Sequence, residues 1–223
     1  MKKNLISLLL TITNCTIQSQ EITSIDRTTS IRAFSGQEAR KYFNDIAQIR
    51  LSLFSQYPYL YKGTLEDERN YLEIYFQSPD AVILLVFDNE KVVGFSNSIP
   101  LTQESEEMKT PFKKQGLNLK EYLYVGEVMV YPDYQHKGIA RKFFEFHEHK
   151  ARTQGYSKVV FMTVNRPENH TFKPTDYRSL EPIWRHFGYE IVPGLVIDFE
   201  WTQIDTNIAT QNCLAIWQKN IIF

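Results

Sequence analysis

The stretch from residue 121 to residue 155 constrains the fold more than any other part of the chain. It reads as an apolar strand, EYLYVGEVMVYPDY, then a turn, QHKGIA, then an amphipathic helix, RKFFEFHEHKARTQG. A glycine turn that leads from a strand into a helix leaves the first N–H groups of the helix without partners, so they converge on an anion. The helix macrodipole adds about half a positive charge at that end. The stretch therefore predicts a phosphate-binding turn between a strand and a helix.

The side chains of the turn also suit a diphosphate. Gly138 allows a close approach, Ala140 stays small for the same reason, and the charges of Lys137 and Arg141 lie within reach. Two rival phosphate motifs, GxxxxGKS/T and GxGxxG, are missing from the sequence. The alternative interpretation is an ordinary strand-to-helix turn with no ligand.

At this turn the sequence resembles the GNAT acyltransferases, whose signature is Gln or Arg, two residues, Gly, one residue, then Gly or Ala. Gln135, Gly138 and Ala140 match it. The resemblance implies acetyl-CoA as the acyl donor and the GNAT fold, an α/β (α+β) arrangement in which helices flank a central mixed, mostly antiparallel sheet. It also implies a set of coenzyme-binding residues: Val128, Met129 and Val130 on the strand, Gln135, His136, Lys137, Gly138, Ile139, Ala140 and Arg141 in the turn, and Asn165 beyond the next strand.

In this arrangement the pantetheine arm runs along the strand like an added edge strand. The N–H groups of Val128 and Val130 would then polarise the thioester carbonyl and hold the oxyanion of the tetrahedral intermediate. For Asn165 an alternative role stays open, because an asparagine in a loop is as commonly a turn former.

The bulk composition narrows the class of protein. With 223 residues, 43% of them hydrophobic, the chain can bury one sizeable core, and its net charge of −1 gives no broad basic surface for nucleic acid. Cys15 and Cys213 lie far apart without a CxxC pair, and the five histidines show no metal-ligand spacing, so neither a disulfide framework nor a metal site is expected.

The first residues, MKKNLISLLLTITNC, look like a short bacterial secretion signal, although Asn14 stands where a lipoprotein site wants a small residue. An acyl-CoA enzyme needs a donor made in the cytosol, so a cytoplasmic protein is favoured and an exported one is the alternative. No stretch reaches the ~20 apolar residues of a membrane span. We expect residues 1–28 to be an N-terminal extension and residues 29–223 to form a single N-acetyltransferase domain.

The remaining elements follow from hydrophobic periodicity and turn residues. We expect a strand at 30–34, a helix at 38–55, a helix from Thr64, capped with Asp67, to about 76, a hairpin of strands at 81–87 and 91–99, a loop or short helical insertion at 100–120, a strand at 158–164, a helix at 180–187, and strands at 195–201 and 213–219. This order is also that of the GNAT fold.

Glu127 is the candidate general base. An amine acceptor is protonated near neutral pH, since a lysine-like amine has an ordinary pKa of about 10.4, so a proton must leave before attack. Glu127 stands in an otherwise apolar strand, where burial shifts a carboxyl group toward proton uptake near neutral pH. The alternatives are a solvent-facing residue or one paired with a basic neighbour.

The candidate general acid departs from the family pattern. GNAT enzymes often protonate the leaving thiolate with a tyrosine on the helix after the fifth strand, four residues before a glycine, and here that position is Trp184. Tyr177, which lies just upstream, is the substitute that we expect.

Three functions remain open from the sequence. The favoured one is transfer of an acetyl group from acetyl-CoA to a small-molecule or protein amine in a ternary complex. The alternatives are a catalytically inactive coenzyme A-binding sensor on the same fold, which Trp184 supports, and an exported binding protein. The acceptor is not encoded in any motif. We expect Tyr57–Tyr61 to pack between two helices, and a wall of the acceptor pocket is the alternative. A homodimer is left open.

Overall fold

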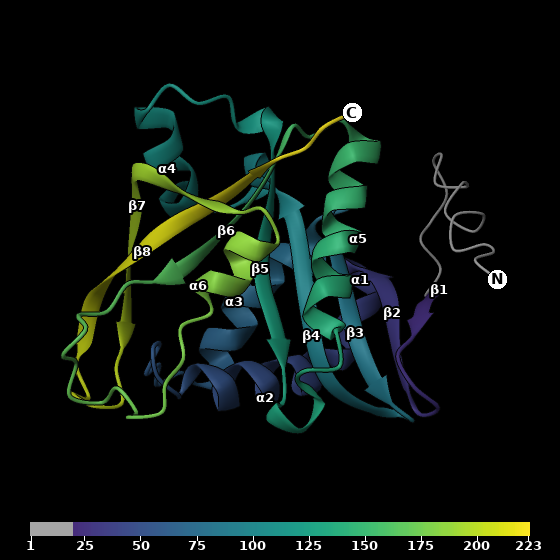
Figure 1. Ribbon diagram of the computed structural model, residues 1–223, viewed down its shortest axis with the longest axis horizontal. Coiled ribbons are helices and arrows are strands. Elements are labelled where there is room, and N and C mark those ends of the chain that lie inside the picture. Colours follow the sequence, from purple (N-terminus) through teal and green to yellow (C-terminus); the bar gives the residue numbers. More distant parts are fainter. Residues whose placement is uncertain (1–19) are drawn as a thin grey trace.

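The computed structural model describes residues 20–223, so the signal-like segment and Cys15 lie outside the described residues. Within this range eight strands form one sheet in the order β1-β2-β3-β4-β5-β6-β8-β7 (Figure 1). Neighbours are antiparallel except for β5 and β6, which are parallel. The strands are β1 Gln20–Ser24, β2 Thr29–Ser35, β3 Val82–Asp88, β4 Lys91–Pro100, β5 Tyr122–Val130, β6 Lys158–Val164, β7 Glu190–Thr202 and β8 Ala209–Asn220.

Helices cover both faces of this sheet. The helices are α1 Gly36–Ala39, α2 Phe43–Phe54, α3 Leu65–Gln77, α4 Glu106–Lys114, α5 Ile139–Gln154 and α6 Glu181–His186, with short 3₁₀ turns η1 Arg40–Tyr42, η2 Leu101–Gln103, η3 Leu119–Glu121 and η4 Pro132–Tyr134. Residues of α1 to α4 pack with one set of strand side chains, and residues of α5 and α6 pack with the other set. The α+β arrangement predicted from the sequence is confirmed.

The central strands are apolar on both sides because each side meets a layer of helices. Every residue of β3 from Val82 to Phe87 is buried, with alternate side chains in two different clusters. Ile83 and Leu85 contact the cluster that holds α2 and α3, whereas Leu84 and Val86 contact the cluster that holds α5. A continuous apolar run therefore identifies a strand with both faces covered.

The helices begin and end largely where their capping residues predict. Thr64 accepts from the Asp67 N–H while the Asp67 carboxylate accepts from the Thr64 N–H, which completes the predicted capping box. Gly155 ends α5 in the left-handed conformation, with φ of 81°. The helix predicted at 38–55 is instead broken into α1 and α2 by η1.

Other boundaries differ from the expected ones. Strand β1 lies inside the segment expected to be an extension, so the sheet begins before residue 29. Strands β7 and β8 are longer than their apolar alternation indicated, because polar residues at their exposed positions also pair in the ladder. The stretch at 100–120 contains α4, which packs against β7.

A β-bulge interrupts the pairing of β4 with β5. Ser98 pairs with Val125 and Ser96 pairs with Val128, so Gly126 and Glu127 together face Asn97. The Asn97 side chain fills the irregularity, because its Oδ1 accepts from the Glu127 N–H at 2.9 Å. The extra residue bends β5 at the middle of the sheet.

Strand β5 then leaves its other neighbour. Among the described residues, β5 pairs with β6 only from Tyr122 to Tyr124. From Gly126 onward one edge of β5 bonds to β4 and the other edge is open. The open edge is the one that faces β6, and the chain continues from the end of β5 through η4 into α5 (Figure 1).

Among residues 20–223, no helix combines the length and the apolar character that crossing a membrane requires.

We predict that Gly126→Ala destabilises the fold by about 1–3 kcal/mol, the usual cost of overpacking. A Cβ at this position would lie 2.5 Å from both Asn97 Oδ1 and the Tyr75 hydroxyl oxygen. Urea denaturation of the two proteins measures the difference. The control is Gly116→Asn, at a glycine with φ of 70° and no atom near the added Cβ. It should cost less than about 1 kcal/mol, because Asn tolerates the left-handed conformation, and equal costs at both sites would contradict the bulge argument.

Candidate functional site

The turn between β5 and α5 presents a run of free backbone donors. Gly138 is the N-cap of α5 with φ of 79°, and His136 also has a positive φ, of 62°. Within residues 20–223, the N–H groups of residues 136–141 have no hydrogen-bond acceptor. No side chain caps this helix. The start of α5 therefore has the geometry of an anion site.

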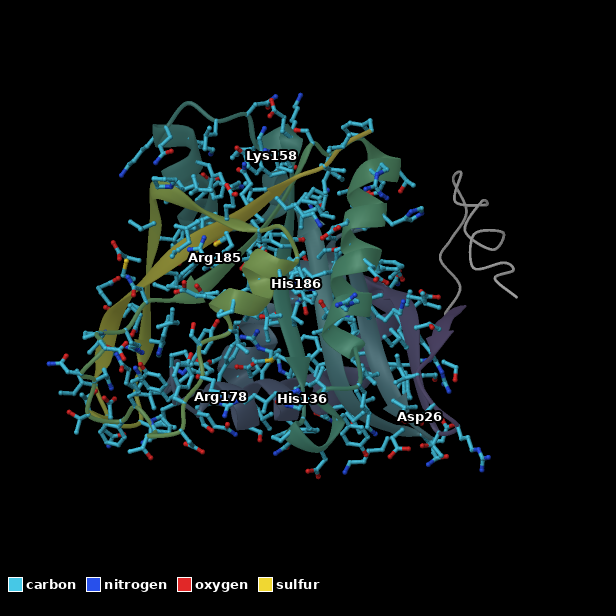
Figure 2. All side chains as sticks on the ribbon, viewed as in Figure 1. Asp26, His136, Lys158, Arg178, Arg185 and His186 are labelled. Atoms are coloured by element: carbon cyan, nitrogen blue, oxygen red, sulfur yellow. The ribbon has the colours of Figure 1, made fainter. Side chains whose placement is uncertain are left out.

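Two cations flank this turn and are held loosely. Lys137 Nζ lies 3.5 Å from Asp26 Oδ2 and 5.1 Å from the centre of the Tyr134 ring, and its side chain is exposed. The Arg141 guanidinium lies 5.7 Å from the centre of the Phe187 ring. An exposed pair of this kind contributes little to stability, so both cations can turn toward an anion at low cost. Figure 2 shows His136 at the end of the sheet where β5 gives way to α5.

The open edge of β5 carries the backbone groups of Val128 and Val130. The Tyr131 N–H donates to the Val93 carbonyl on β4. Because the backbone N–H and C=O groups of successive strand residues point to opposite edges, those of Met129 face β4 and those of Val128 and Val130 face the open edge. The Val130 carbonyl accepts from Gln135 Nε2 at 3.2 Å. The glutamine of the signature thus fixes the turn against the end of the strand.

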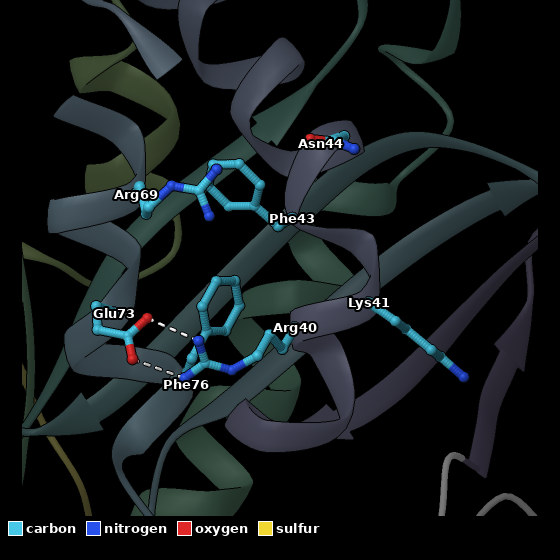
Figure 3. A pocket seen from close by; sticks show the side chains of 7 residues that line it. All are labelled: Arg40, Lys41, Phe43, Asn44, Arg69, Glu73 and Phe76. Atoms are coloured by element: carbon cyan, nitrogen blue, oxygen red, sulfur yellow. Dashed lines mark hydrogen bonds and ion pairs between the residues drawn. The ribbon is translucent and has the colours of Figure 1, made fainter. Parts of the chain in front are cut away.

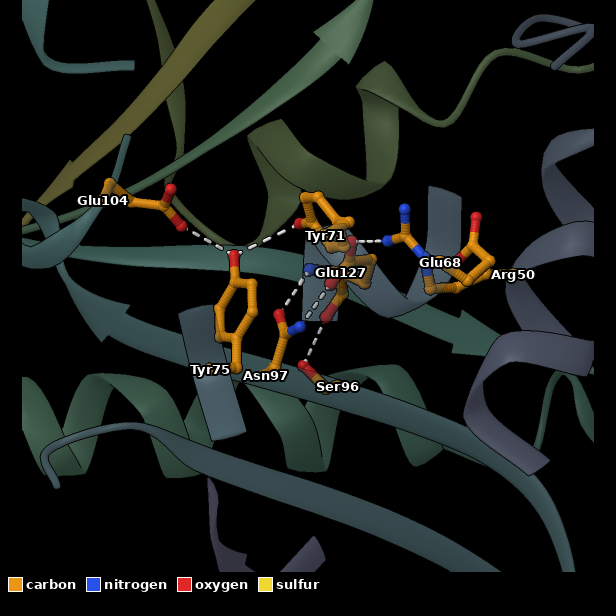
Figure 4. Close-up of polar contacts among 8 residues, drawn as sticks. All are labelled: Arg50, Glu68, Tyr71, Tyr75, Ser96, Asn97, Glu104 and Glu127. Atoms are coloured by element: carbon orange, nitrogen blue, oxygen red, sulfur yellow. Dashed lines mark hydrogen bonds and ion pairs between the residues drawn. The ribbon is translucent and has the colours of Figure 1, made fainter. Parts of the chain in front are cut away.

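Glu127 lies in a buried polar network and not in an apolar pocket (Figure 4). Its Oε1 accepts from Arg50 of α2, and its Oε2 accepts from the Asn97 amide. Arg50 donates a second bond, from Nε, to Glu68 of α3. Of the alternatives left open by the sequence, pairing with a basic residue is therefore the one that the structure has.

A chain of phenols extends this network. The Tyr71 and Tyr75 hydroxyl oxygens lie 3.2 Å apart, and Tyr75 donates to Glu104 Oε1 at 2.8 Å. Burial raises the pKa of Glu104, and it raises the pKa of Tyr75 well above the ordinary value. Since Tyr75 donates its proton to Glu104, the proton between the two phenols comes from Tyr71.

The comparisons with known proteins agree with this geometry. The sequence profile of the acetyltransferase (GNAT) family matches residues 45–173, which is more than half of the chain. The chain belongs to the acetyltransferase (GNAT) family. Comparison with curated protein sequences gave no match.

Solved structures of other GNAT proteins have the same fold at low sequence identity. An acetyltransferase of Streptococcus agalactiae is 15% identical with a TM-score of 0.57, covering 87% of this chain and 99% of that one. An acetyltransferase of Salmonella typhimurium, whose structure includes acetyl-CoA, is 15% identical with a TM-score of 0.56, covering 87% and 95%. The ribosomal-protein-alanine N-acetyltransferase of Brucella melitensis is 13% identical with a TM-score of 0.55, covering 85% and 98%.

The tyrosine segment after α2, Tyr57–Tyr61, is bonded through its backbone to residues that follow β6 or lie in β7. Arg166 donates to the carbonyls of Pro58 and Tyr59 at 2.7 and 3.0 Å, and Trp201 Nε1 donates to the Tyr59 carbonyl at 3.1 Å. Burial raises the pKa of Tyr59 to about 12. The segment is thus joined to β7 and to the loop after β6.

The other predicted residues lie beyond β6. Tyr177 packs edge-on against Tyr57, with ring centres 4.7 Å apart, and burial raises its pKa. The Asn165 N–H donates to the Cys213 carbonyl at 2.9 Å, and the side chain is exposed. Trp184 packs at 5.0 Å from Trp217 and 5.5 Å from Phe161, measured between ring centres. The Trp184 indole therefore packs α6 against the apolar side chains of β6 and β8.

A surface hollow lies elsewhere in this GNAT protein. A cavity of about 330 Å³ between η1, α2 and α3 is lined by Arg40, Lys41, Phe43, Asn44, Arg69, Glu73 and Phe76 (Figure 3). Arg40 forms two 2.8 Å bonds to the Glu73 carboxylate across it. The hollow is on the sheet face opposite α5, so it is not part of the turn. No three His, Cys, Asp or Glu side chains gather as metal ligands anywhere in residues 20–223.

Sequence reasoning missed the residues that hold Glu127. Arg50 and Glu68 sit on the buried faces of helices, four residues after Ile46 and four before Leu72. The sequence signal that could have indicated their burial is a charged residue within the apolar stripe of a helix. Arg50 bonds to Glu68, 18 residues away, and to Glu127, 77 residues away. Neither pairing has a signature in the sequence spacing.

His147 of α5 supports the bulge from the other face. The Ser96 hydroxyl donates to the Glu127 carbonyl at 2.6 Å, and His147 Nε2 lies 2.8 Å from the same oxygen of Ser96. Because Ser96 has one proton, the imidazole donates from Nε2 and leaves Nδ1 bare. Burial lowers the pKa of His147 to about 3, so the ring is neutral at pH 7.

We predict that His147 makes the fold less stable in mild acid. Below pH 6.5 this histidine is protonated in the unfolded chain, but in the folded protein it stays neutral down to about pH 3. The free energy of unfolding therefore falls as the pH falls. The loss should reach about 2 kcal/mol between pH 6.5 and pH 5, at about 1.4 kcal/mol per unit. In urea denaturation His147→Gln should flatten this slope, whereas His149→Gln on the same helix should keep it. An unchanged slope in His147→Gln would contradict the assignment.

Proposed function

We propose that this protein is an acetyl-CoA-dependent N-acetyltransferase that transfers the acetyl group directly to an amine. The observation that carries the proposal is the left-handed Gly138 turn, whose free N–H groups start α5 shortly after β5, a strand with one edge open beyond Tyr124. A ligand with a diphosphate and a linear arm suits this arrangement, because the diphosphate matches the turn and the arm matches the open edge of β5. The Salmonella typhimurium relative was solved with acetyl-CoA.

The donor is expected to bind through backbone groups. The diphosphate accepts from the N–H groups of residues 136–141, and Lys137 and Arg141 neutralise its charge. The pantetheine amides pair with Val128 and Val130 along the open edge, and Met129, which turns to β4, contributes to the strand that supports them. Asn165, which directly follows β6, is the proposed side-chain contact to the pantetheine arm. These roles require no change in the sheet.

The chemistry follows from where the thioester then lies. The amine nitrogen attacks the thioester carbonyl, a C–N bond forms, the C–S bond breaks, and the coenzyme A thiolate leaves. The N–H of Val128 is the donor that we propose to hold the oxyanion. The proton lost by the ammonium passes to Glu127, directly or through water.

The thiolate then takes a proton. Tyr177 is the proposed donor, because Trp184 stands at the usual tyrosine position and an indole N–H is too weak an acid. The raised pKa of Tyr177 keeps the phenol protonated at neutral pH. A thiol of pKa about 8.5 is also a fair leaving group without help.

A second candidate function is a coenzyme A sensor without catalysis. The observation in its favour is that both oxygens of Glu127 are already bonded, one to Arg50 and one to Asn97. Coenzyme A binding without acetyl transfer to any amine would select the sensor.

We predict that Gly138→Asp weakens acetyl-CoA binding by about tenfold or more, equivalent to about 1.4 kcal/mol. An added Cβ meets no atom within 4 Å, so the fold should survive. The carboxylate would face the phosphate. Isothermal titration calorimetry measures the affinity.

Gly138→Asn is the matched control, since it has the same backbone cost and nearly the same shape but no charge. It should bind clearly better than the aspartate variant. Equal affinity of Gly138→Asp and wild type would refute the phosphate assignment.

We predict that Glu127→Gln lowers kcat by about 100-fold, the usual scale for loss of a general base. The acidic limb of the pH–rate profile should vanish with it, because the titrating group is gone. Steady-state release of coenzyme A measures both. The KM for acetyl-CoA should hold, since Glu127 faces α2 and not the turn. A variant with the wild-type rate and profile would remove Glu127 from the mechanism.

A further inference from the structure

The hollow between η1, α2 and α3 has the size of a small-molecule site. Its volume is about 330 Å³, at the lower end of the range for such sites. It lies on the sheet face opposite α5, so the transfer of an acetyl group at the Gly138 turn makes no use of it. This Arg69 hollow is lined by Arg40, Lys41, Phe43, Asn44, Arg69, Glu73 and Phe76.

Two phenyl rings form the apolar part of the Arg69 hollow, and each has a guanidinium beside it. The rings of Phe43 and Phe76 pack edge-on, with centres 6.5 Å apart. The Arg69 guanidinium lies 4.7 Å from the centre of the Phe43 ring, and that of Arg40 lies 5.2 Å from the centre of the Phe76 ring. Figure 3 shows both rings between the two guanidiniums, whereas Lys41 points away. A guanidinium that lies on a ring keeps its planar set of N–H donors for an anion.

The two arginines differ in how many of these donors are already used. Arg40 donates from Nη1 and Nη2 to the two oxygens of Glu73, both at 2.8 Å. The Arg69 guanidinium donates no hydrogen bond within residues 20–223, and its ion-pair contact with Glu66 is 3.9 Å long. An exposed pair of this kind is weak, so a ligand can compete with it. All five N–H groups of Arg69 are therefore available to an acceptor.

The charge around the Arg69 hollow is positive. The Arg40 bond lowers the pKa of Glu73, and the charge of Arg69 adds to this effect, so the carboxylate is ionised at neutral pH. With Glu66 at the rim included, three cationic side chains surround the hollow and two carboxylates oppose them. One positive charge is left without a counter-charge.

We propose that the Arg69 hollow binds a small organic carboxylate, which accepts a bidentate pair of hydrogen bonds from Arg69 and packs its apolar part on the rings of Phe43 and Phe76. The site goes beyond the acetyltransferase function proposed above and does not depend on it. An excess of one positive charge matches a monoanion. The planar fork of a guanidinium matches a carboxylate, and a ring beside the fork matches an apolar group attached to that carboxylate.

Inorganic phosphate fits this hollow less well. A phosphate group has a charge of about −1.5 to −2 at pH 7, which exceeds the positive charge that the hollow offers. The carboxylates of Glu73 and Glu66 would repel the additional charge. Inorganic phosphate also brings no apolar surface to the two rings. A carboxylate with an aromatic body avoids both costs.

The test is an NMR titration of the isotope-labelled protein with benzoate, benzamide and inorganic phosphate, followed through the backbone amide signals. Benzoate and benzamide share a ring and nearly the same shape, and only benzoate is charged. We expect benzoate to shift the signals of residues 40–44 and 69–76. It should bind about fivefold more tightly than benzamide or phosphate, the scale of one exposed ion pair.

Three results of this titration would overturn the proposal. Equal affinity for benzoate and benzamide would show that the carboxylate contributes nothing. Tighter binding of phosphate would make the hollow a phosphate site. Shifts confined to residues 136–141 would show that benzoate occupies the turn and not the hollow.

The matched variants are Arg69→Gln and Arg185→Gln, which each remove one exposed arginine from a helix. Arg69 is 61% exposed and lies 3.9 Å from Glu66, and Arg185 on α6 is 56% exposed and lies 3.8 Å from Glu181. Arg69→Gln should weaken benzoate about fivefold and leave benzamide unchanged, whereas Arg185→Gln should change neither. Benzoate binding that survives intact in Arg69→Gln would remove Arg69 from the site.

The failure of this proposal and that of the acetyltransferase proposal can be told apart, because the titration measures binding and needs no turnover. If no amine is acetylated but benzoate shifts the signals of residues 40–44 and 69–76, the carboxylate site stands without the enzyme function. If an amine is acetylated and benzoate leaves these signals unchanged, the carboxylate site is wrong and the enzyme function stands.

Discussion

Strand β5 pairs with β6 for only three residues, Tyr122 to Tyr124, and the rest of the site depends on that limit. Beyond Tyr124 the bulge at Gly126 and Glu127 bends the strand, and the Asn97 amide satisfies the backbone that the bulge would leave unpaired. Beyond the bend, main-chain donors and acceptors on one edge of β5 are unpaired, although β5 lies in the middle of the sheet and not at its border. The same bend turns Glu127 into the layer of α2 and α3, where Arg50 binds it.

Two kinds of interaction hold this region. Apolar packing on both faces fixes β3 and β4 and so gives the bulge a rigid neighbour. The polar groups at the bulge are bonded almost completely, through Asn97, Ser96, His147 and Arg50. The exceptions within residues 20–223 include two buried atoms near the bulge, Ser98 Oγ and His147 Nδ1.

The parts that the sequence predicted are those that local rules decide. The Gly138 turn, the Thr64 capping box and the succession of strands from β2 to β8 along the chain follow from local sequence patterns, and the structure has them. The Arg50–Glu127 pair could not be predicted, because it joins residues 77 positions apart through the packing of α2 on the sheet. Trp184 stands where the resemblance leads one to expect a tyrosine, and its packing on Trp217 gives a reason for its size. Tyr177 as the acid and Glu127 as the base remain predictions.

The most direct measurement of the central claim is a crystal structure of the protein with coenzyme A. The account predicts that the diphosphate accepts hydrogen bonds from the N–H groups of residues 136–141. It also predicts that the pantetheine amides pair with Val128 and Val130, so that the thiol ends beside the bulge at Glu127. A diphosphate bound elsewhere, for example in the hollow lined by Arg40 and Arg69, would contradict the account. So would a pantetheine arm that does not follow the open edge of β5.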